Sequence, residues 1–269
     1  MQAENRFGIW NDTKFGAVTR MEKTVVKAIN VLEMLARDSR PRALGEIASS
    51  CDITKSNAHR LLATLTELDF VRQVPDDRTY EVTLKLWELG MRVFERFDIR
   101  PIAAPHLRAL QDKTDESVHL SIFDDGHAVY VDKLDSSHAL RAYIRIGERA
   151  PAAHTATGRA MLAFLDEAAF LSASHDLKRH TLLTMMTPEA LRAAIGDVRS
   201  QGYALTRGEW REGVVGVAAP IRTRSGAVMA GIGVAGPTER MTDEALTHAI
   251  DTVLATARAI AADLERSMS

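Results

Sequence analysis

Three absences narrow the class of protein to which this chain of 269 residues belongs. It has a single cysteine, Cys51, which excludes a framework of internal disulfides and is typical of the cytoplasm. It has no run of about 18 apolar residues, so we expect no membrane-spanning helix and no membrane partner. The first ten residues lack the apolar segment of a signal peptide. We therefore expect a cytoplasmic protein in which Cys51 is a small core residue rather than a redox sensor.

Signatures of catalysis are also missing, although nine histidines are present. His175 and His180 are five residues apart, a spacing that aligns poorly for a shared metal ligand on one helix. The chain has no Gly-x-Ser-x-Gly nucleophile turn, no phosphate-binding Walker loop and no Gly-x-Gly-x-x-Gly after a strand. We expect no metal, no cofactor and no enzymatic activity.

Neither sign of charge predominates, since 34 Lys and Arg residues stand against 36 Asp and Glu residues, a net charge of −2. With 46% hydrophobic and 26% charged residues the composition is that of an ordinary globular protein, and the length favours two domains. Any basic surface for nucleic acid therefore has to be local.

The most informative pattern that is present covers residues 43–65. Asp52 and Ile53 leave room only for a tight turn between two apolar stripes, and Thr54 is a good N-cap for a second helix. Two short helices joined in this way form a helix-turn-helix, whose second helix enters the DNA major groove. An ordinary helical hairpin with a solvated polar face fits the same periodicity. The stripes, with apolar residues at i, i+3, i+4 and i+7, are Leu44, Ile47, Ala48, Cys51 and Ala58, Leu61, Leu62, Leu65.

The flanking segments favour the helix-turn-helix over the plain hairpin. Residues 70–74 and 79–82 flank a turn at 75–78 and predict a β-hairpin. Three helices followed by a two-stranded hairpin make a winged helix-turn-helix, here over residues 21–83. The helix that precedes the pair is predicted from a stripe of Val25, Ala28, Ile29, Leu32, Leu35 and Ala36.

Polar side chains occupy the face of the second helix opposite its apolar stripe. Ser56 and Arg60 lie opposite the stripe and Asn57 and His59 flank them, so these side chains are placed to read base edges. Residues 21–83 hold nine Lys and Arg against ten Asp and Glu, so we expect affinity to come from pairing several modules. The candidate DNA-binding residues are Lys55, Ser56, Asn57, His59, Arg60, Arg72 and Arg78.

Residue 84 marks a change of pattern. Residues 84–100 predict a linker helix that is apolar on several sides and ends before Pro101, which favours contact with the same helix of a second subunit. Residues 101–269 alternate helix and strand and predict an α+β domain, whereas residues 1–20 predict a loosely docked arm. The elements expected in the C-terminal part are helices at 101–114, 157–165, 188–200 and 242–266 and strands at 118–122, 128–132, 140–146, 214–222 and 227–235.

Short motifs recur between Lys23 and Arg266. They are Lys55-Ser56, His59-Arg60-Leu61-Leu62-Ala63-Thr64-Leu65, Leu86-Trp87-Glu88-Leu89-Gly90, Val129-Tyr130-Val131-Asp132-Lys133, Pro151 with Thr155-Ala156, Gly158 and Ala160, Gly202-Tyr203-Ala204, Gly213-Val214, Ala218-Ala219-Pro220-Ile221 and Gly236-Pro237. In this order and spacing they resemble the IclR family of bacterial transcriptional regulators. The resemblance implies an N-terminal winged helix-turn-helix, a dimerising linker helix and a C-terminal GAF-like effector-binding domain. It also implies a homodimer or a dimer-of-dimers tetramer on a palindromic operator in double-stranded DNA.

The resemblance further implies a ligand cavity in the C-terminal domain. Backbone N–H groups of Ala156 and Thr157 at a helix start would attract a carboxylate. His154 and Arg207 are candidate anion partners and Trp210 a candidate stacking surface, although solvent-facing or structural roles fit them equally. The cavity walls implied by the resemblance are Leu140, Ala142, Ala150, Thr206, Val214, Gly216, Gly233 and Ala235.

Departures from the family pattern bear on the ligand. In relatives that bind small oxoacids, polar side chains occupy the positions of Gly216, Gly233 and Ala235, and this chain has none there. We therefore expect a regulator of a catabolic operon, either a repressor or an activator, with an aromatic or apolar carboxylic acid as effector. Glycines within a strand are also explained by close packing, which leaves no cavity. The alternative function is a DNA-binding protein whose C-terminal half only oligomerises.

Overall fold

The computed structural model describes residues 22–38, 40–75, 77–94 and 99–268. The chain divides into two compact units, with the division after Arg96. The arm predicted over residues 1–20 lies outside the described residues, as do Asp76 of the predicted turn and residues 95–98 of the predicted linker.

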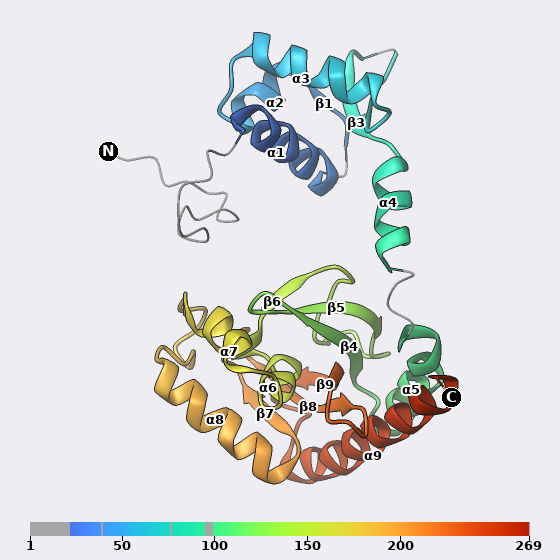
Figure 1. The fold of residues 1–269 in the computed structure, drawn as a ribbon, viewed down its shortest axis with the longest axis vertical. Helices are drawn as coiled ribbons and strands as arrows, with labels where there is room; N and C mark the ends of the chain where they lie inside the picture. The colour runs from blue at the N-terminus through green and yellow to red at the C-terminus, as the bar shows by residue number, and fades with distance from the viewer. Residues whose placement is uncertain (1–21, 39, 76, 95–98, 269) are drawn as a thin grey trace. The chain divides into compact units, whose positions relative to one another are not determined.

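The N-terminal unit is the predicted winged helix-turn-helix. Its elements are α1 (Lys23–Arg37), β1 (Arg42–Ala43), α2 (Leu44–Ser50), α3 (Lys55–Glu67), β2 (Val71–Gln73) and β3 (Thr79–Val82). The strands form an antiparallel sheet in the order β1-β3-β2 (Figure 1). Ile47 of α2, Leu62 of α3 and Val71 of β2 pack with α1 in one core. This core fixes α2 against α3 and leaves the outer face of α3 uncovered.

The turn between α2 and α3 follows the local rules read from the sequence. Asp52 adopts a left-handed backbone conformation with φ of 50°, which aspartate tolerates better than most residues. The Thr54 hydroxyl oxygen accepts a hydrogen bond from the Asn57 N–H at 3.2 Å and caps α3. One part of the prediction is wrong: Val25 and Ile29 of α1 are 58% and 42% exposed. Among the described residues, the buried side chains of α1 lie in its C-terminal half and include Val31 in place of Ile29.

Helix α4 (Lys85–Phe94) follows the wing and presents apolar side chains to solvent. Leu84, which directly precedes the helix, and Trp87 and Val93 within it are 74%, 63% and 53% exposed. The next helix, α5 (Ile99–Thr114), begins before Pro101. Pro101 therefore lies in the first turn of α5 instead of ending the linker, and there its missing N–H removes no helical hydrogen bond.

The C-terminal unit contains a six-stranded antiparallel sheet in the order β6-β5-β4-β9-β8-β7. Helices α5 and α9 cover one face, and α6 with α7 and α8 around it covers the other (Figure 1). On β8, Val215 and Val217 pack toward α9, whereas Gly216 and Ala218 face α6. The elements are β4 (Ser117–Asp124), β5 (His127–Leu134), β6 (Arg149–Pro151), the 3-10 turn η1 (Ala152–His154), α6 (Ala156–Leu162), α7 (Glu167–Ser174), α8 (Pro188–Gln201), β7 (Ala204–Arg207), β8 (Val214–Arg222), β9 (Val228–Pro237) and α9 (Asp243–Met268).

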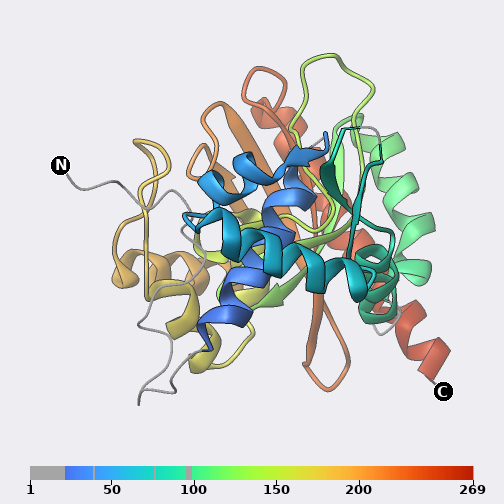
Figure 2. The same cartoon turned by 90° about the horizontal axis from the view of Figure 1, so that it is seen from above.

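Two loops emerge at the same end of this sheet, residues 135–148 between β5 and β6 and residues 208–213 between β7 and β8 (Figure 2). The strand predicted over 140–146 is wrong, because the segment is a loop in which only Ala142 and Ile144 are buried. Its apolar alternation reflects these two inward side chains and not pairing with a neighbouring strand. Helix α7 and the short strands β6 and β7 were not predicted.

Candidate functional site

The outer face of α3 carries the predicted DNA-binding side chains. Lys55, Ser56, His59 and Arg60 are exposed, and Asn57 is half-buried. Within the described residues these four exposed side chains make no hydrogen bond or ion pair. Their donors and acceptors are therefore free to contact another molecule, as base recognition in a groove requires.

Residues 21–83 have a net negative charge, yet α3 presents basic side chains. The reason is that acidic side chains elsewhere in the unit are paired with arginines. Arg40 donates a hydrogen bond to Glu46 at 2.8 Å and lowers the pKa of this carboxyl to about 2. Arg72 of β2 is exposed but paired with Glu81 at 2.6 Å. Arg78 is exposed in the wing turn with φ of 51°. The acidic side chains Glu46 and Glu81 are thus neutralised locally, away from α3.

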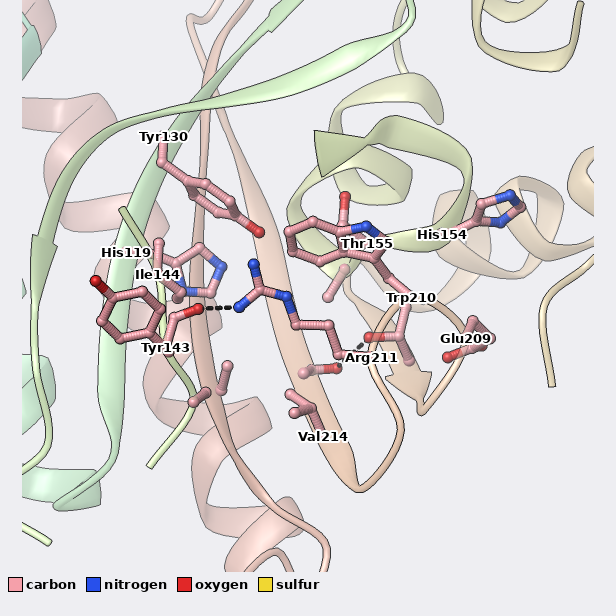
Figure 3. Close-up of a pocket in the computed structure, with 15 residues that line it drawn as sticks. His119, Tyr130, Tyr143, Ile144, His154, Thr155, Glu209, Trp210, Arg211 and Val214 are labelled. Atoms are coloured by element: carbon pink, nitrogen blue, oxygen red, sulfur yellow. Dashed lines mark hydrogen bonds between the residues drawn. The ribbon is translucent and has the colours of Figure 1, made fainter. Parts of the chain in front are cut away.

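A cavity lies in the C-terminal unit between η1, the start of α6, the strands β4, β5, β7, β8 and β9, and the two loops. Thr206 of β7 pairs with Gly216 of β8, which pairs with Ala235 of β9, so three small residues form one row. This row leaves a hollow with an open volume of about 50 Å³. The residues around it are His119, Tyr130, Ala142, Tyr143, Ile144, His154, Thr155, Ala156, Thr206, Glu209, Trp210, Arg211, Val214, Gly216 and Ala235 (Figure 3).

The structure places eight of the predicted effector residues in this wall: Ala142, His154, Ala156, Thr206, Trp210, Val214, Gly216 and Ala235. Five others lie outside it. Leu140 is 65% exposed, and Ala150 is buried in a cluster with Tyr130. The Thr157 hydroxyl accepts a hydrogen bond from the Ser121 hydroxyl at 3.2 Å. Arg207 is exposed, and its guanidinium lies 4.0 Å from the Asp243 carboxylate. The fifth residue, Gly233, is absent from the wall and allows close packing of neighbouring elements.

The glycines of the β8–β9 hairpin divide between the two roles considered from the sequence. A Cβ atom at Gly233 would meet Thr157 Cγ2 at 3.0 Å and His119 Nε2 at 3.1 Å, so this glycine lets α6 and β4 approach. A Cβ atom at Gly216 would meet Thr206 Oγ1 at 3.0 Å and would narrow the cavity itself. Close packing and cavity formation therefore occur on the same face of the sheet.

Seven lining residues were not predicted: His119, Tyr130, Tyr143, Ile144, Thr155, Glu209 and Arg211. The alternation of His119 with Val118 and Leu120 indicated only that the histidine lies on the other strand face. Packing of α6 on this face buries it, and that packing is not visible in the local sequence. The available signal was a histidine between two apolar strand residues, Val118 and Leu120.

Arg211 connects the two loops across the cavity. Its guanidinium donates a hydrogen bond to the Tyr143 carbonyl oxygen (Figure 3). It donates another, at 2.5 Å, to the Glu148 carboxylate. It also lies over the Trp210 ring, 4.2 Å from the ring centroid. A cation is thereby held beside aromatic side chains at a cavity whose wall combines small apolar residues with polar ones such as His119, Thr206 and Glu209.

The loop that carries Arg211 is anchored from beneath. Arg159 of α6 is buried and pairs with Glu209 at 3.0 Å. Thr181 and Thr184 donate hydrogen bonds to the carbonyl oxygens of Gly208 and Glu209, at 2.6 and 2.7 Å. These contacts hold residues 208–213 in one conformation, which preorganises the cavity wall.

Two histidines in the wall are neutral at ordinary pH. Burial lowers the pKa of His119 and of His154 to about 4, and His180 and Arg159 add to the effect at His154. Burial also raises the pKa of Tyr130. The positive charge at the cavity therefore comes from Arg211 and not from imidazolium.

The part of the chain that the structure describes contains no helix long and apolar enough to span a bilayer. Among the same residues, His, Cys, Asp and Glu side chains nowhere gather in threes around a space for a metal ion.

Comparison with known proteins gives relatives for both units. The IclR helix-turn-helix domain matches residues 24–75, and the bacterial transcriptional regulator IclR C-terminal domain matches residues 91–262. The HTH-type transcriptional regulator KdgR of Escherichia coli K12 is 34% identical over 243 residues, which cover 90% of this chain and 92% of that protein. XynR of the same organism, also an HTH-type transcriptional regulator, is 32% identical over 228 residues, which cover 84% and 90%.

A solved structure agrees with these matches. The crystal structure of Thermotoga maritima IclR is 30% identical, covers 91% of this chain and 99% of its own, and superposes with a TM-score of 0.75. The chain therefore belongs to the IclR family of bacterial transcriptional regulators, ligand-responsive proteins that bind DNA through a helix-turn-helix domain.

Proposed function

We propose that α3 reads an operator and that the C-terminal cavity binds an aromatic or apolar carboxylic acid, which controls DNA binding at a catabolic operon. The observation that carries this proposal is the Arg211 guanidinium at a cavity of small and aromatic side chains. It supplies the one feature a carboxylate needs, a planar pair of donors.

The anion partner in this proposal is Arg211, in place of Arg207. Arg207 is half-exposed on β7, whereas Arg211 lines the cavity and contacts Glu148. Glu148 and the Tyr143 carbonyl oxygen each accept one hydrogen bond from this guanidinium, which has five N–H donors, so donors remain for a ligand carboxylate. The N–H groups at the start of α6 are a weaker partner, because a helix of seven residues has a small dipole.

The body of the acid would pack against apolar and aromatic groups. The Tyr130 and Trp210 ring centroids are 6.4 Å apart, and Ile144 and Val214 complete the apolar wall. Such walls favour a planar or branched apolar body over a two-carbon acid, since each buried methylene contributes about 0.8 kcal/mol.

We also infer that the chain acts as a homodimer or a dimer of dimers on palindromic DNA. The support is the exposed apolar surface around α4, where Leu84, Trp87 and Val93 lie in solvent in one protomer. A two-fold pair of α3 helices would meet successive major grooves roughly 34 Å apart. Acid binding would alter this placement, and such coupling typically amounts to about 1–3 kcal/mol.

The DNA part of the proposal is tested with an operator fragment mapped by footprinting of genomic DNA. Arg60→Ala should weaken operator binding about tenfold or more, since one base contact contributes roughly 1–3 kcal/mol. It should leave the affinity for the acid unchanged. Arg37→Ala is the control, because it removes an equal charge from α1 where Arg37 pairs with Glu33. Equal losses in the two variants would contradict the assignment of α3.

The effector part is tested by calorimetry with benzoate and cyclohexanecarboxylate on the full chain. We expect at least one of them to bind, and Arg211→Gln to weaken it about tenfold or more, whereas the matched control Arg207→Gln retains binding. Failure of both acids to bind would refute the ligand class. An equal effect of the two substitutions would refute the role of Arg211.

A further inference from the structure

A second cavity lies in the C-terminal unit on the opposite face of the six-stranded sheet. It has an open volume of about 170 Å³ and lies between the end of α5, the loop after β5, strand β9 and the start of α9. Val234 of β9 lines it and pairs with Val217, which packs toward α9, whereas the next residue, Ala235, lines the first cavity. Since a water molecule occupies about 30 Å³ in the liquid, the second cavity is large enough for a small organic molecule.

The carboxylate and the guanidinium in its wall are paired with each other. Glu116 is 5% exposed, and Arg240 donates a hydrogen bond to each of its two carboxylate oxygens. A Cβ atom at Gly236 would lie 2.7 Å from Glu116 Cδ, so this glycine leaves the room that the buried carboxylate occupies. A charged ligand would compete with one member of this pair for the other and would lose its own hydration, which is costly. The second cavity therefore suits an uncharged molecule.

The polar atoms that remain define the hydrogen bonds this molecule needs. Arg240 Nη1 makes no hydrogen bond among the described residues, so it remains a donor. His248 Nε2 lies 3.1 Å from the Lys113 carbonyl oxygen, which can only accept, and His138 Nε2 lies 3.1 Å from Asp115 Oδ2. Each ring therefore carries a proton on Nε2 and, in its neutral form, keeps Nδ1 as an acceptor. A ligand has to accept from the guanidinium and donate to the imidazoles, and a hydroxyl group does both.

Apolar side chains make up most of the remaining wall. Val234 is completely buried, Met241 and Ala249 are 4% and 2% exposed, and Ala245 is half-buried. We propose that the second cavity binds a small uncharged polyol or sugar. Its hydroxyl groups contact Arg240 and the two histidines, and its carbon skeleton packs against these apolar side chains. This site is separate from the first cavity and adds a second ligand to the proposed function.

Calorimetry of the full chain with erythritol, xylitol and D-xylose tests this site. We expect at least one of them to bind with a Kd of about 1 mM or tighter. Ala245→Leu places a larger side chain in the space of the ligand and should weaken binding about tenfold or more. His248→Phe removes one acceptor and should weaken binding about fivefold or more. Thermal unfolding establishes that each variant is folded, and the exposed position of His248 keeps the test decisive if Ala245→Leu does not fold.

Ala255→Leu is the matched control, because Ala255 is exposed on α9 and lies outside the wall. This variant should bind like the wild type. Arg211→Gln should also retain binding, since Arg211 lines the first cavity. Absence of binding by all three compounds, wild-type affinity in either folded cavity variant, or an equal loss in Arg211→Gln would overturn this inference. The acid titrations test the proposed function independently of these results.

Discussion

Gly158 provides the sharpest test of how the cavity is built. It lies in α6 where this helix crosses η1, and a Cβ atom at this position would sit 2.3 Å from both Ala152 Cα and Ala152 O. Carbon atoms in contact are normally about 3.5–4.0 Å apart. Because the opposing atoms belong to the backbone, Gly158→Ala requires η1 or α6 to move as a whole.

The expected magnitude follows from two opposing effects. Alanine favours a helix over glycine by roughly 0.8–1 kcal/mol, whereas overpacking a buried contact typically costs about 1–3 kcal/mol and occasionally more. An overlap of more than about 1 Å with backbone belongs at the upper end of that range. We expect a net loss of about 2 kcal/mol, or roughly 4–8 °C in Tm for a unit of this size.

Circular dichroism during urea and thermal unfolding measures this loss. Gly196→Ala is the matched control, because Gly196 lies within α8 and its Cβ would have no neighbour within 4 Å. That variant should gain up to about 1 kcal/mol from helix propensity alone. Acid binding should weaken only in Gly158→Ala, since α6 and η1 carry part of the cavity wall. A Gly158→Ala protein as stable as wild type would refute the reasoning.

Three further predictions concern stability. Thr54→Ala removes the acceptor for the Asn57 N–H and should destabilise the N-terminal unit by about 1 kcal/mol in urea unfolding; no loss would mean the cap is dispensable. Glu209→Gln leaves the buried Arg159 charge without its carboxylate and should cost roughly 3–5 kcal/mol, and a loss below about 1 kcal/mol would contradict the pairing. The pKa of His154 is about 4 when folded, below its value near 6.5 when unfolded, so the unfolded chain binds the proton first as pH falls. Unfolding free energy should therefore drop by about 1.4 kcal/mol per unit between about pH 6.5 and 4, and His154→Gln should remove this contribution from the measured slope.

The helix-turn-helix was predictable because its determinants are local. Asp52 forms the turn and Thr54 caps the helix that follows it, both through neighbouring residues. The spacing of apolar residues in α3 indicates which face of that helix points outward. The prediction for α1 was partly wrong because burial of a helix face depends on packing against other elements and not on local spacing alone. Val25 and Ile29 have helical spacing, but among the residues that the structure describes they remain 58% and 42% exposed.

The cavity depends on contacts between distant segments and was predicted only in part. The register of Thr206, Gly216 and Ala235 requires three strands to align, and sequence spacing alone does not specify it. Family resemblance supplied those positions. It did not distinguish Arg207 from Arg211, since the inward arginine is selected by Glu148, 63 residues away in the chain.

The tie made by Arg211 has a kinetic consequence. Because it joins residues 135–148 to residues 208–213 beside a small hollow, separating the two segments requires these contacts to break. If the cavity holds the proposed acid, the rate at which they break would contribute to how long that acid stays bound, in the way that lid opening governs product release in many enzymes. In the proposed mechanism, one ion pair at the rim would thus help to set the residence time of the effector.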